Sequence, residues 1–300
     1  MTHDAIIIGG SFAGLAAALY TARARLDVLV IDAGAPRNRF AAHSHGFLAH
    51  DGDEPGAILA AARAQVAQYP TVRFVEGRAA TARPDGEGFA VTLDDGQEIS
   101  GRRLVLAYGL RDELPAIPGL AERWGKSVIH CPYCHGYEFS DQRLGVLATS
   151  PMSVHQAQLI PEWGPTTFFL NGQFEPDVAQ LEDLDRRGVT IERRRVVEVL
   201  GDGGSLSALR LEDGATIPLE ALYVGPRSHA NSDIATQLGC EHDEIFWGQM
   251  IRTDMMKQTT VPGVFAAGDI TRGGHAVTFA AADGVMVGTA LHRSLVFPNH

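Results

Sequence analysis

The chain has 300 residues, a length that suits about two domains of ordinary size. Its hydrophobic fraction of 45% and charged fraction of 20% are those of a globular protein, which excludes disordered, coiled-coil and low-complexity scaffolds. With 25 Lys and Arg against 36 Asp and Glu, the net charge of −11 leaves no basic surface for nucleic acid or anionic lipid.

The cysteine content and the N-terminal segment bear on the compartment. Cys131, Cys134 and Cys240 are too few, and odd in number, for a disulfide-rich secreted domain. The apolar residues 5–20 follow an acidic leader without Lys or Arg, unlike a signal peptide, and they are few for a membrane span. We therefore expect a soluble, cytoplasmic protein without a membrane partner.

The N-terminal segment predicts a strand, a glycine-rich turn, a helix and a second strand. Residues 4–8 include three consecutive isoleucines, as in a strand buried on both faces of a parallel sheet. The turn Gly9-Gly10-Ser11-Phe12-Ala13-Gly14 leads into an alanine-rich helix, and residues 28–32 form a strand that ends at Asp32. Glycines of this kind permit a tight turn and close approach of a pyrophosphate, although Ser11 replaces the central glycine. The alternative is a tight turn without a ligand.

The next segments predict an α/β domain that contains an inserted β segment. A helix is expected over residues 54–68 and a short strand over 73–77. Residues 89–93 and 98–106 flank an Asp-Asp-Gly turn, which is typical of a hairpin that leads into a strand. Proline and glycine residues between 107 and 119 mark the first domain boundary.

A second strand-and-helix unit follows this boundary. A strand is expected over 143–149, a helix over 153–163 and a further strand over 166–170. Residues 206–211 and 216–224 are joined across an Asp-Gly turn and predict another hairpin.

The last part of the chain returns to the first domain. Residues 264–269 predict a strand and 276–295 a closing helix, which complete the first sheet. We therefore predict an α/β fold with two Rossmann-like nucleotide-binding domains. The first is discontinuous, with residues 1–112 and 241–300 on either side of a central domain over 113–240.

The pair Cys131 and Cys134, followed by His135, allows three interpretations. A Cys-x-x-Cys-His motif attaches c-type haem, but that chemistry needs export, for which we expect no signal segment. A zinc site needs two further ligands, and the chain has no second cysteine pair, so we expect no metal site. The two-residue spacing lets both sulfurs close a small ring and lowers the pKa of a thiolate, which favours a redox-active disulfide.

The order of these motifs resembles that of the low-molecular-weight thioredoxin reductase family over essentially the whole chain. The resemblance rests on the glycine turn, on Ala107-Tyr108-Gly109, on the Cys-Pro-Tyr-Cys motif and on residues 261–269, which end in Gly268-Asp269. It implies an FAD-dependent homodimer. It also implies that Cys134 contacts the flavin while Cys131 attacks or releases the substrate.

The cofactor-binding residues that we expect come from the turn motifs and from this resemblance. Asp32 is placed to accept a hydrogen bond from a ribose hydroxyl, and Gly268 with Asp269 matches the family's contact to the ribityl and phosphate groups. His275 and Ala276 stand where the flavin-facing helix begins, so that His275 either lines the isoalloxazine ring or caps the helix. The FAD-binding set is Gly9, Gly10, Ser11, Ala13, Gly14, Asp32, Gly109, Gly268, Asp269, His275 and Ala276.

The proton chemistry departs from the family pattern. The family usually has an aspartate directly after the second cysteine, where this chain has His135. An imidazole titrates near neutral pH and can accept a thiol proton and return it, although a surface histidine is the plainer interpretation. Glu138 is a second candidate for proton transfer, with a solvated carboxylate as the alternative.

The second nucleotide-binding motif is degraded. The matching turn, residues 148–153, contains no glycine, so a pyrophosphate would meet side chains. No Lys or Arg occurs from Trp163 to Asp185, where the family places cations for the 2′-phosphate of NADPH, and five carboxylates occur there instead. NADPH is therefore a doubtful cofactor.

These departures, with residues 36–39 and the His45-Gly46-Phe47-Leu48 loop, resemble a sub-branch that includes the gliotoxin-type dithiol oxidases. The resemblance implies that a small dithiol is oxidised through the cysteine pair, and that electrons pass through FAD to oxygen. Two alternatives stay open: a disulfide reductase that is fed by NADPH or another donor and acts on a small disulfide or a thioredoxin-like protein, and a flavin-binding redox sensor.

Overall fold

The computed structural model describes residues 2–246 and 248–298, and its contacts divide the chain into two compact units. Unit 1 consists of residues 1–37, 56–111 and 228–300, and unit 2 of residues 38–55 and 112–227. The domain boundaries predicted from the sequence, at residues 112 and 240, describe folding domains rather than contact units, and they stay a prediction. The contacts divide the chain at 227–228 because Ile234, Leu238 and Cys240 already pack in the core of unit 1.

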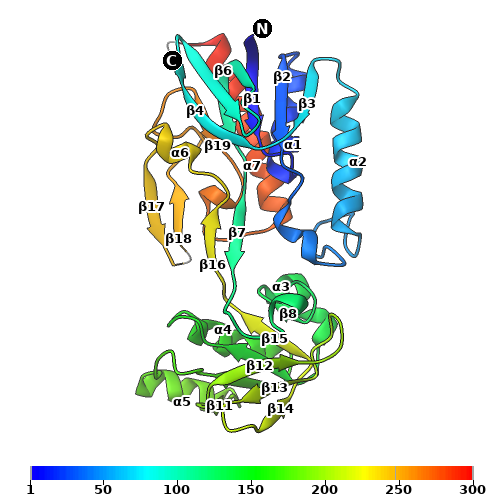
Figure 1. The fold of residues 1–300 in the computed structure, drawn as a ribbon, viewed down its shortest axis with the longest axis vertical. Coiled ribbons are helices and arrows are strands. Elements are labelled where there is room, and N and C mark those ends of the chain that lie inside the picture. The colour runs from blue at the N-terminus through cyan, green and yellow to red at the C-terminus, as the bar shows by residue number, and fades with distance from the viewer. Residues whose placement is uncertain (1, 247, 299–300) are drawn as a thin grey trace. The chain divides into compact units, whose positions relative to one another are not determined.

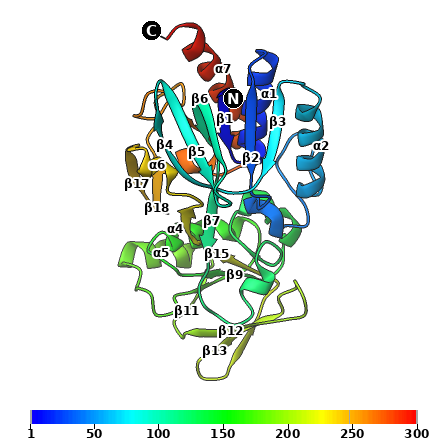
Figure 2. The same cartoon turned by 45° about the horizontal axis from the view of Figure 1, so that its top comes forward.

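Unit 1 is built on a seven-stranded sheet in the order β3-β2-β1-β6-β5-β4, with β19 also paired to β6. Pairing is parallel among β1, β2, β3, β6 and β19. The strands β4, β5 and β6 form an antiparallel insert, in which β5 and β6 are the predicted hairpin and β4 is a further strand. Figure 2 shows this insert beside the parallel strands. The sheet strands are β1 (Thr2–Ile8), β2 (Val28–Asp32), β3 (Val72–Glu76), β4 (Ala79–Asp85), β5 (Gly88–Leu93), β6 (Glu98–Leu106) and β19 (Val264–Ala266).

Helices cover the parallel part of this sheet, as Figure 1 shows. Helices α1 and α7 pack closely because glycines face the partner helix: a Cβ on Gly284 would lie 2.2 Å from the Ala13 carbonyl oxygen, and one on Gly288 2.6 Å from Tyr20 Cβ. The remaining elements are α1 (Phe12–Arg23), α2 (Pro55–Ala67), β7 (Leu110–Glu113), β16 (Arg227–Ala230), α6 (Ile234–Gln237), β17 (His242–Ile245), β18 (Gly248–Ile251) and α7 (Val277–Val296).

Unit 2 contains a parallel five-stranded sheet, β11-β10-β9-β15-β8, and an antiparallel three-stranded sheet, β12-β13-β14. Their apolar faces pack together around Leu147, Phe169, Leu209 and Leu222. The elements are β8 (Val128–Ile129), α3 (Pro132–His135), β9 (Leu144–Leu147), α4 (Ser153–Leu159), β10 (Thr166–Phe169), α5 (Val178–Arg186), β11 (Thr190–Glu192), β12 (Val196–Leu200), β13 (Ala208–Leu211), β14 (Thr216–Pro218) and β15 (Ala221–Val224).

One sequence-based expectation is wrong in unit 2. Residues 216–224 do not form a single hairpin strand, because only β14 pairs with β13 whereas β15 enters the parallel sheet between β9 and β8. The chain turns between them at Leu219 and Glu220, where the Glu220 amide donates to the Arg143 carbonyl.

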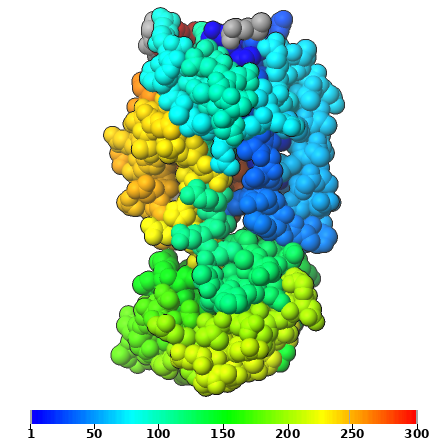
Figure 3. Space-filling model, viewed as in Figure 1, coloured from blue at the N-terminus to red at the C-terminus, as the bar shows by residue number. Residues whose placement is uncertain are grey.

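The segment 38–55 groups with unit 2 although it is far from the rest of that unit in sequence. Gly125 has a φ of 74°, and a Cβ there would lie 2.8 Å from Phe40 Cβ. In the space-filling view the blue atoms of this segment border the green atoms of residues near 125–140 (Figure 3). In residues 2–246 and 248–298, no helix is long and apolar enough to cross a membrane.

Candidate active site

The carboxyl ends of three neighbouring strands of unit 1 bring the predicted cofactor turns together. β6 pairs with β1 on one side and with β19 on the other, all in parallel. The Ala107 amide donates to the Ile8 carbonyl at 2.8 Å, and the Ala267 amide to the Leu106 carbonyl at 2.9 Å. The turns that contain Gly9, Gly109 and Gly268 therefore lie at one edge of the sheet, where parallel α/β folds bind ligands.

The first turn requires glycine for three separate close approaches. A Cβ would lie 2.2 Å from the Ala107 oxygen at Gly9, 1.8 Å from the Gly9 oxygen at Gly14, and 2.5 Å from Asp32 Cγ at Gly10. Gly9 also has a φ of 116°, which other residues rarely adopt. Ser11 is the N-cap of α1, and its side chain makes no capping hydrogen bond. The turn thus keeps the start of α1 open to an anion, as an FAD pyrophosphate requires.

Asp32 ends β2 with its carboxylate already oriented. One oxygen accepts from the Gly34 amide at 3.1 Å, and the other lies 3.1 Å from Arg63 Nη1. The Arg63 guanidinium in turn covers the Phe74 ring at 4.3 Å. These contacts fix a carboxylate beside Gly10, which suits the ribose-binding role predicted for it.

Arg37 is a residue of this site for which the sequence indicated no role. Its guanidinium lies 2.9 Å from Asp269 Oδ2, donates to Ser228 Oγ at 3.2 Å and lies 2.7 Å from His275 Nδ1. Because arginine can only donate, Nδ1 of His275 is the acceptor. The only sequence signal was its place in residues 36–39, which were quoted for the sub-branch, since its partner Asp269 is 232 residues away.

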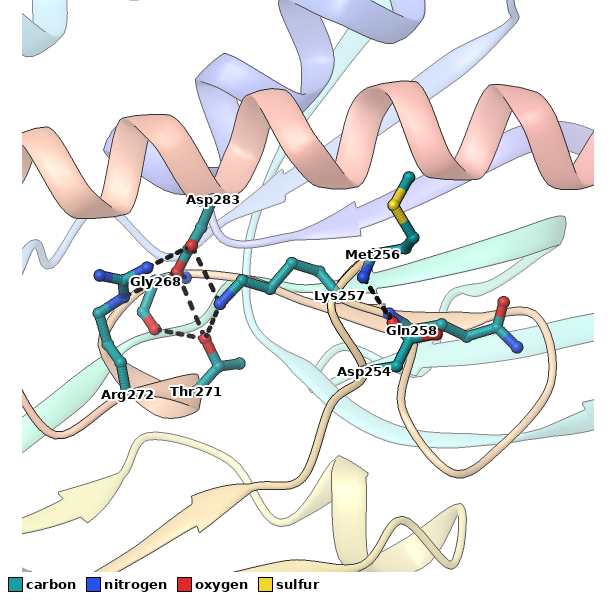
Figure 4. A network of polar contacts seen from close by, with 8 residues as sticks. All are labelled: Asp254, Met256, Lys257, Gln258, Gly268, Thr271, Arg272 and Asp283. Atoms are coloured by element: carbon teal, nitrogen blue, oxygen red, sulfur yellow. Dashed lines mark hydrogen bonds and ion pairs between the residues drawn. The ribbon is translucent and has the colours of Figure 1, made fainter.

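A buried ionic network holds the turn that precedes α7 (Figure 4). Asp283 is fully buried on α7, and its carboxylate lies 3.0 Å from Lys257 Nζ and 2.5 Å from Arg272 Nη2. It also accepts from the Gly268 amide at 3.3 Å and from Thr271 Oγ1 at 3.4 Å. A single carboxylate therefore fixes the backbone on both sides of Asp269.

The cysteine pair lies at the start of a short helix in unit 2. Cys131 is the N-cap of α3, Cys134 lies one turn later, and the two form a disulfide with 5.3 Å between Cα atoms. Gly136 follows with no room for a Cβ, which would lie 2.9 Å from Trp163 Nε1. The Tyr133 ring packs edge-on against Trp163 at 5.6 Å. Both cysteines are half-buried.

The polar side chains next to the disulfide form a cluster. The His45 ring lies edge-on to His135 with 6.3 Å between centroids, and His45 Nε2 is 3.3 Å from Glu138 Oε1. Burial lowers the pKa of His135, Glu138 raises it and His45 lowers it. In the described part of the chain, the His135 imidazole makes no hydrogen bond to either sulfur. His45 stood in the loop quoted for the sub-branch, but sequence alone did not place it beside His135.

This cluster opens into a cavity of about 490 Å³ whose lining residues all belong to unit 2. Its charged and titratable lining consists of His43, His45, Lys126, His135, Glu138 and Glu220. Cavities of this size bind small organic molecules.

The second nucleotide turn is closed by its own side chains. The amides of Thr149 and Ser150 both donate to Ser153 Oγ, at 3.1 and 3.4 Å, and Thr149 Oγ1 donates to the Gly225 carbonyl at 2.7 Å. The backbone groups that would face a pyrophosphate are thus already bonded, and α4 has only seven residues.

The region after β10 is richer in cations than its sequence indicates. The interval 163–185 contains no Lys or Arg, but Arg193 lies 2.6 Å from Glu175, and a Cβ on Gly172 would lie 3.1 Å from Arg195 Nε. The expectation that a 2′-phosphate would meet no cation there needs this correction. β11 and β12 bring these arginines next to β10 from outside the interval.

The sequence comparison identifies the family. The model of pyridine nucleotide-disulphide oxidoreductases matches residues 3–284. The chain belongs to this family. It is 35% identical to the thioredoxin reductase tcpT of Claviceps purpurea over 278 residues, which cover 89% of this chain and 86% of that protein.

Solved structures agree with the fold. An oxidoreductase from Agrobacterium tumefaciens is 49% identical, with a TM-score of 0.95 and complete coverage of both chains. The structure of HlmI is 40% identical with a TM-score of 0.93, covering 98% of this chain and 93% of that one. The predicted fold class and the resemblance to thioredoxin reductases are confirmed, and the protein is an FAD-dependent oxidoreductase.

Proposed function

We propose that the protein is a dithiol oxidase that uses Cys131 and Cys134 as its redox pair and oxygen as its electron acceptor. In the net reaction a dithiol and O₂ give a cyclic disulfide and H₂O₂, so that two electrons and two protons leave the substrate. FAD, when bound, accepts two electrons from a dithiol and passes them to oxygen.

The observation that carries this proposal is the closed turn before α4. Ser153 Oγ accepts hydrogen bonds from the Thr149 and Ser150 amides, which a dinucleotide would need as donors to its pyrophosphate. Without a well-bound pyridine nucleotide, the reducing electrons have to come from the thiol side.

The residues around the disulfide support substrate oxidation. Attack by a substrate thiolate on Cys131 would break the Cys131–Cys134 bond and form a mixed disulfide, which the second substrate thiolate resolves. A base is needed to remove the thiol proton, and burial keeps His135 largely neutral at neutral pH because its pKa is lowered. In the same cluster, His45 Nε2 is in contact with the Glu138 carboxylate.

The unit 1 turns support FAD as the resident cofactor. We assign the pyrophosphate to the Gly9–Gly14 turn, the ribose to Asp32 and the ribityl chain to Gly268 and Asp269. Ser11, Ala13, Gly109, His275 and Ala276 complete the proposed set, and Arg37 orients Asp269 and His275 within it.

The test is an anaerobic reduction of the purified holoenzyme. We expect dithiothreitol to bleach the flavin, millimolar NADPH to leave it largely oxidised, and oxygen to restore the yellow form. The Cys134→Ser variant serves as the control for direct reduction by the thiol. Rapid stoichiometric reduction by micromolar NADPH would contradict the oxidase.

A disulfide reductase is the second candidate, and two observations favour it. The relative in Claviceps purpurea is named a thioredoxin reductase, and Arg195 supplies one cation near the end of β10. Such a charge-assisted contact contributes about 1.5–3 kcal/mol, or roughly 10- to 100-fold in affinity. The same titration separates the two candidates, because a reductase is reduced by a pyridine nucleotide.

A further inference from the structure

We propose that the cavity of unit 2 binds a small dithiol that carries a carboxylate, and that Lys126 recognises this carboxylate. The inference rests on the proposed dithiol oxidation and names its substrate class. It starts from the charges that line the cavity.

The acidic side chains of the cavity are already paired. The Arg143 guanidinium binds Glu220, with 3.2 Å from Nε to Oε2, and holds the pKa of Glu220 below its ordinary value. Glu138 lies 3.3 Å from His45 Nε2. Lys126, in contrast, has no ion-pair partner among residues 2–246 and 248–298. The cavity therefore offers a cation without an internal counterion.

The Lys126 side chain is seated on a rigid loop. Its stem crosses Gly204, where a Cβ would lie 2.4 Å from Lys126 Cδ. Ser127 Oγ donates to the Gly204 carbonyl at 2.7 Å, and Arg123 Nε, from a buried side chain, donates to the Ser205 carbonyl at 3.1 Å. These bonds fix the notch that receives the lysine stem, while Lys126 as a whole stays exposed.

The cavity lies next to the redox pair, although neither cysteine is among its lining residues. His135 lines it, and this residue directly follows Cys134 in α3. A molecule in the cavity would contact Lys126 with its anionic group and His135 with the part that carries the thiols. A volume of about 490 Å³ suits a small molecule.

Dihydrolipoate and dihydrolipoamide test this because they share one dithiol and differ in charge. We expect the wild-type holoenzyme to oxidise both, with kcat/KM about tenfold higher for dihydrolipoate, since a hydrogen bond between charged groups contributes on this order. Lys126→Met should abolish the preference by lowering only the dihydrolipoate value, and Lys126→Glu should reverse it.

Two further variants control the experiment. Arg210→Met removes one cation of unit 2 outside the cavity, where Arg210 pairs with Glu198 at 2.8 Å, and should keep the preference. Gly204→Ala should reduce it by displacing the lysine stem. Equal oxidation of both compounds by wild type and Lys126→Met would overturn the carboxylate site and leave the oxidase standing. Oxidation of neither compound would instead contradict the proposed function.

Discussion

Replacing Asp283 tests whether the buried ionic network holds the turn around Asp269. Asp283→Asn keeps the size and polarity of the side chain but removes its charge, which leaves Lys257 and Arg272 facing each other. The Lys257 side chain is 12% exposed and that of Arg272 26%, so the arginine reaches water more readily than the lysine.

The expected cost follows from this difference. Removing one partner of a buried ion pair destabilises a protein by about 3–5 kcal/mol, and we expect the lower end because Arg272 is part-exposed. The Gly268 amide and Thr271 hydroxyl also lose a charged acceptor. FAD retention should weaken at least tenfold, since these groups fix the turn on both sides of Asp269.

The measurements are thermal unfolding followed by flavin fluorescence and the FAD dissociation constant of the same samples. A matched control is Asp254→Asn, because Asp254 is exposed and its side chain accepts from the Met256 and Gln258 amides at 2.8 and 2.9 Å (Figure 4). Lys257→Met combined with Asp283→Leu removes the buried charge pair and should recover much of the lost stability. An Asp283→Asn protein that unfolds and binds FAD like wild type would refute the reasoning.

Four further predictions concern the cofactor and the redox centre. Cys131→Ser and Cys134→Ser should each abolish turnover, and only the variant that keeps Cys134 should show a long-wavelength thiolate–flavin band in absorption spectra; the opposite pattern would exchange the two roles. His135→Ala should slow the reductive half-reaction about 100-fold, as the loss of a general base does. Because burial lowers the His135 pKa, wild-type activity should rise with pH through an inflection below the ordinary histidine value. Glu138→Gln should move that inflection to lower pH, since Glu138 raises the pKa of His135. An unchanged pH profile would show that Glu138 does not act on His135. Asp32→Ala should weaken FAD binding by about 1.5–3 kcal/mol in equilibrium titration, and unchanged affinity would contradict the ribose contact.

Elements whose signal lies within a few residues were predictable. The strand at 28–32 and the hairpin of residues 89–106 appear in the structure as expected, because alternation and turn composition act locally. Residues 216–224 show the limit of this reasoning. These residues are apolar except for Thr216 and Glu220, and the break at Glu220 depends on pairing with Arg143, which is 77 residues away.

The residues of the site could likewise be predicted where their signal is local, and not where it depends on distant partners. The need for glycine at Gly9 and Gly14 could be inferred from the turn motif, and the structure supplies the close contacts behind it. Asp283 and Lys257 carry no motif, and residues 36–39 give no sign of Arg37's partner, because only the tertiary fold brings these partners close. The expected shortage of cations after β10 failed for this reason as well, since Arg195 comes from the loop between β11 and β12.

The net charge of the protein and the charge of the proposed substrate have the same sign, which constrains how an anionic dithiol is selected. A chain with a net charge of −11 repels anions at long range, but this repulsion is screened over about 8 Å at physiological salt. Recognition then depends on contacts inside the cavity. There Glu220 is paired with Arg143, and Glu138 is in contact with His45. Lys126 is left to act on the ligand. Local pairing, rather than overall charge, therefore makes this cavity suitable for a carboxylate.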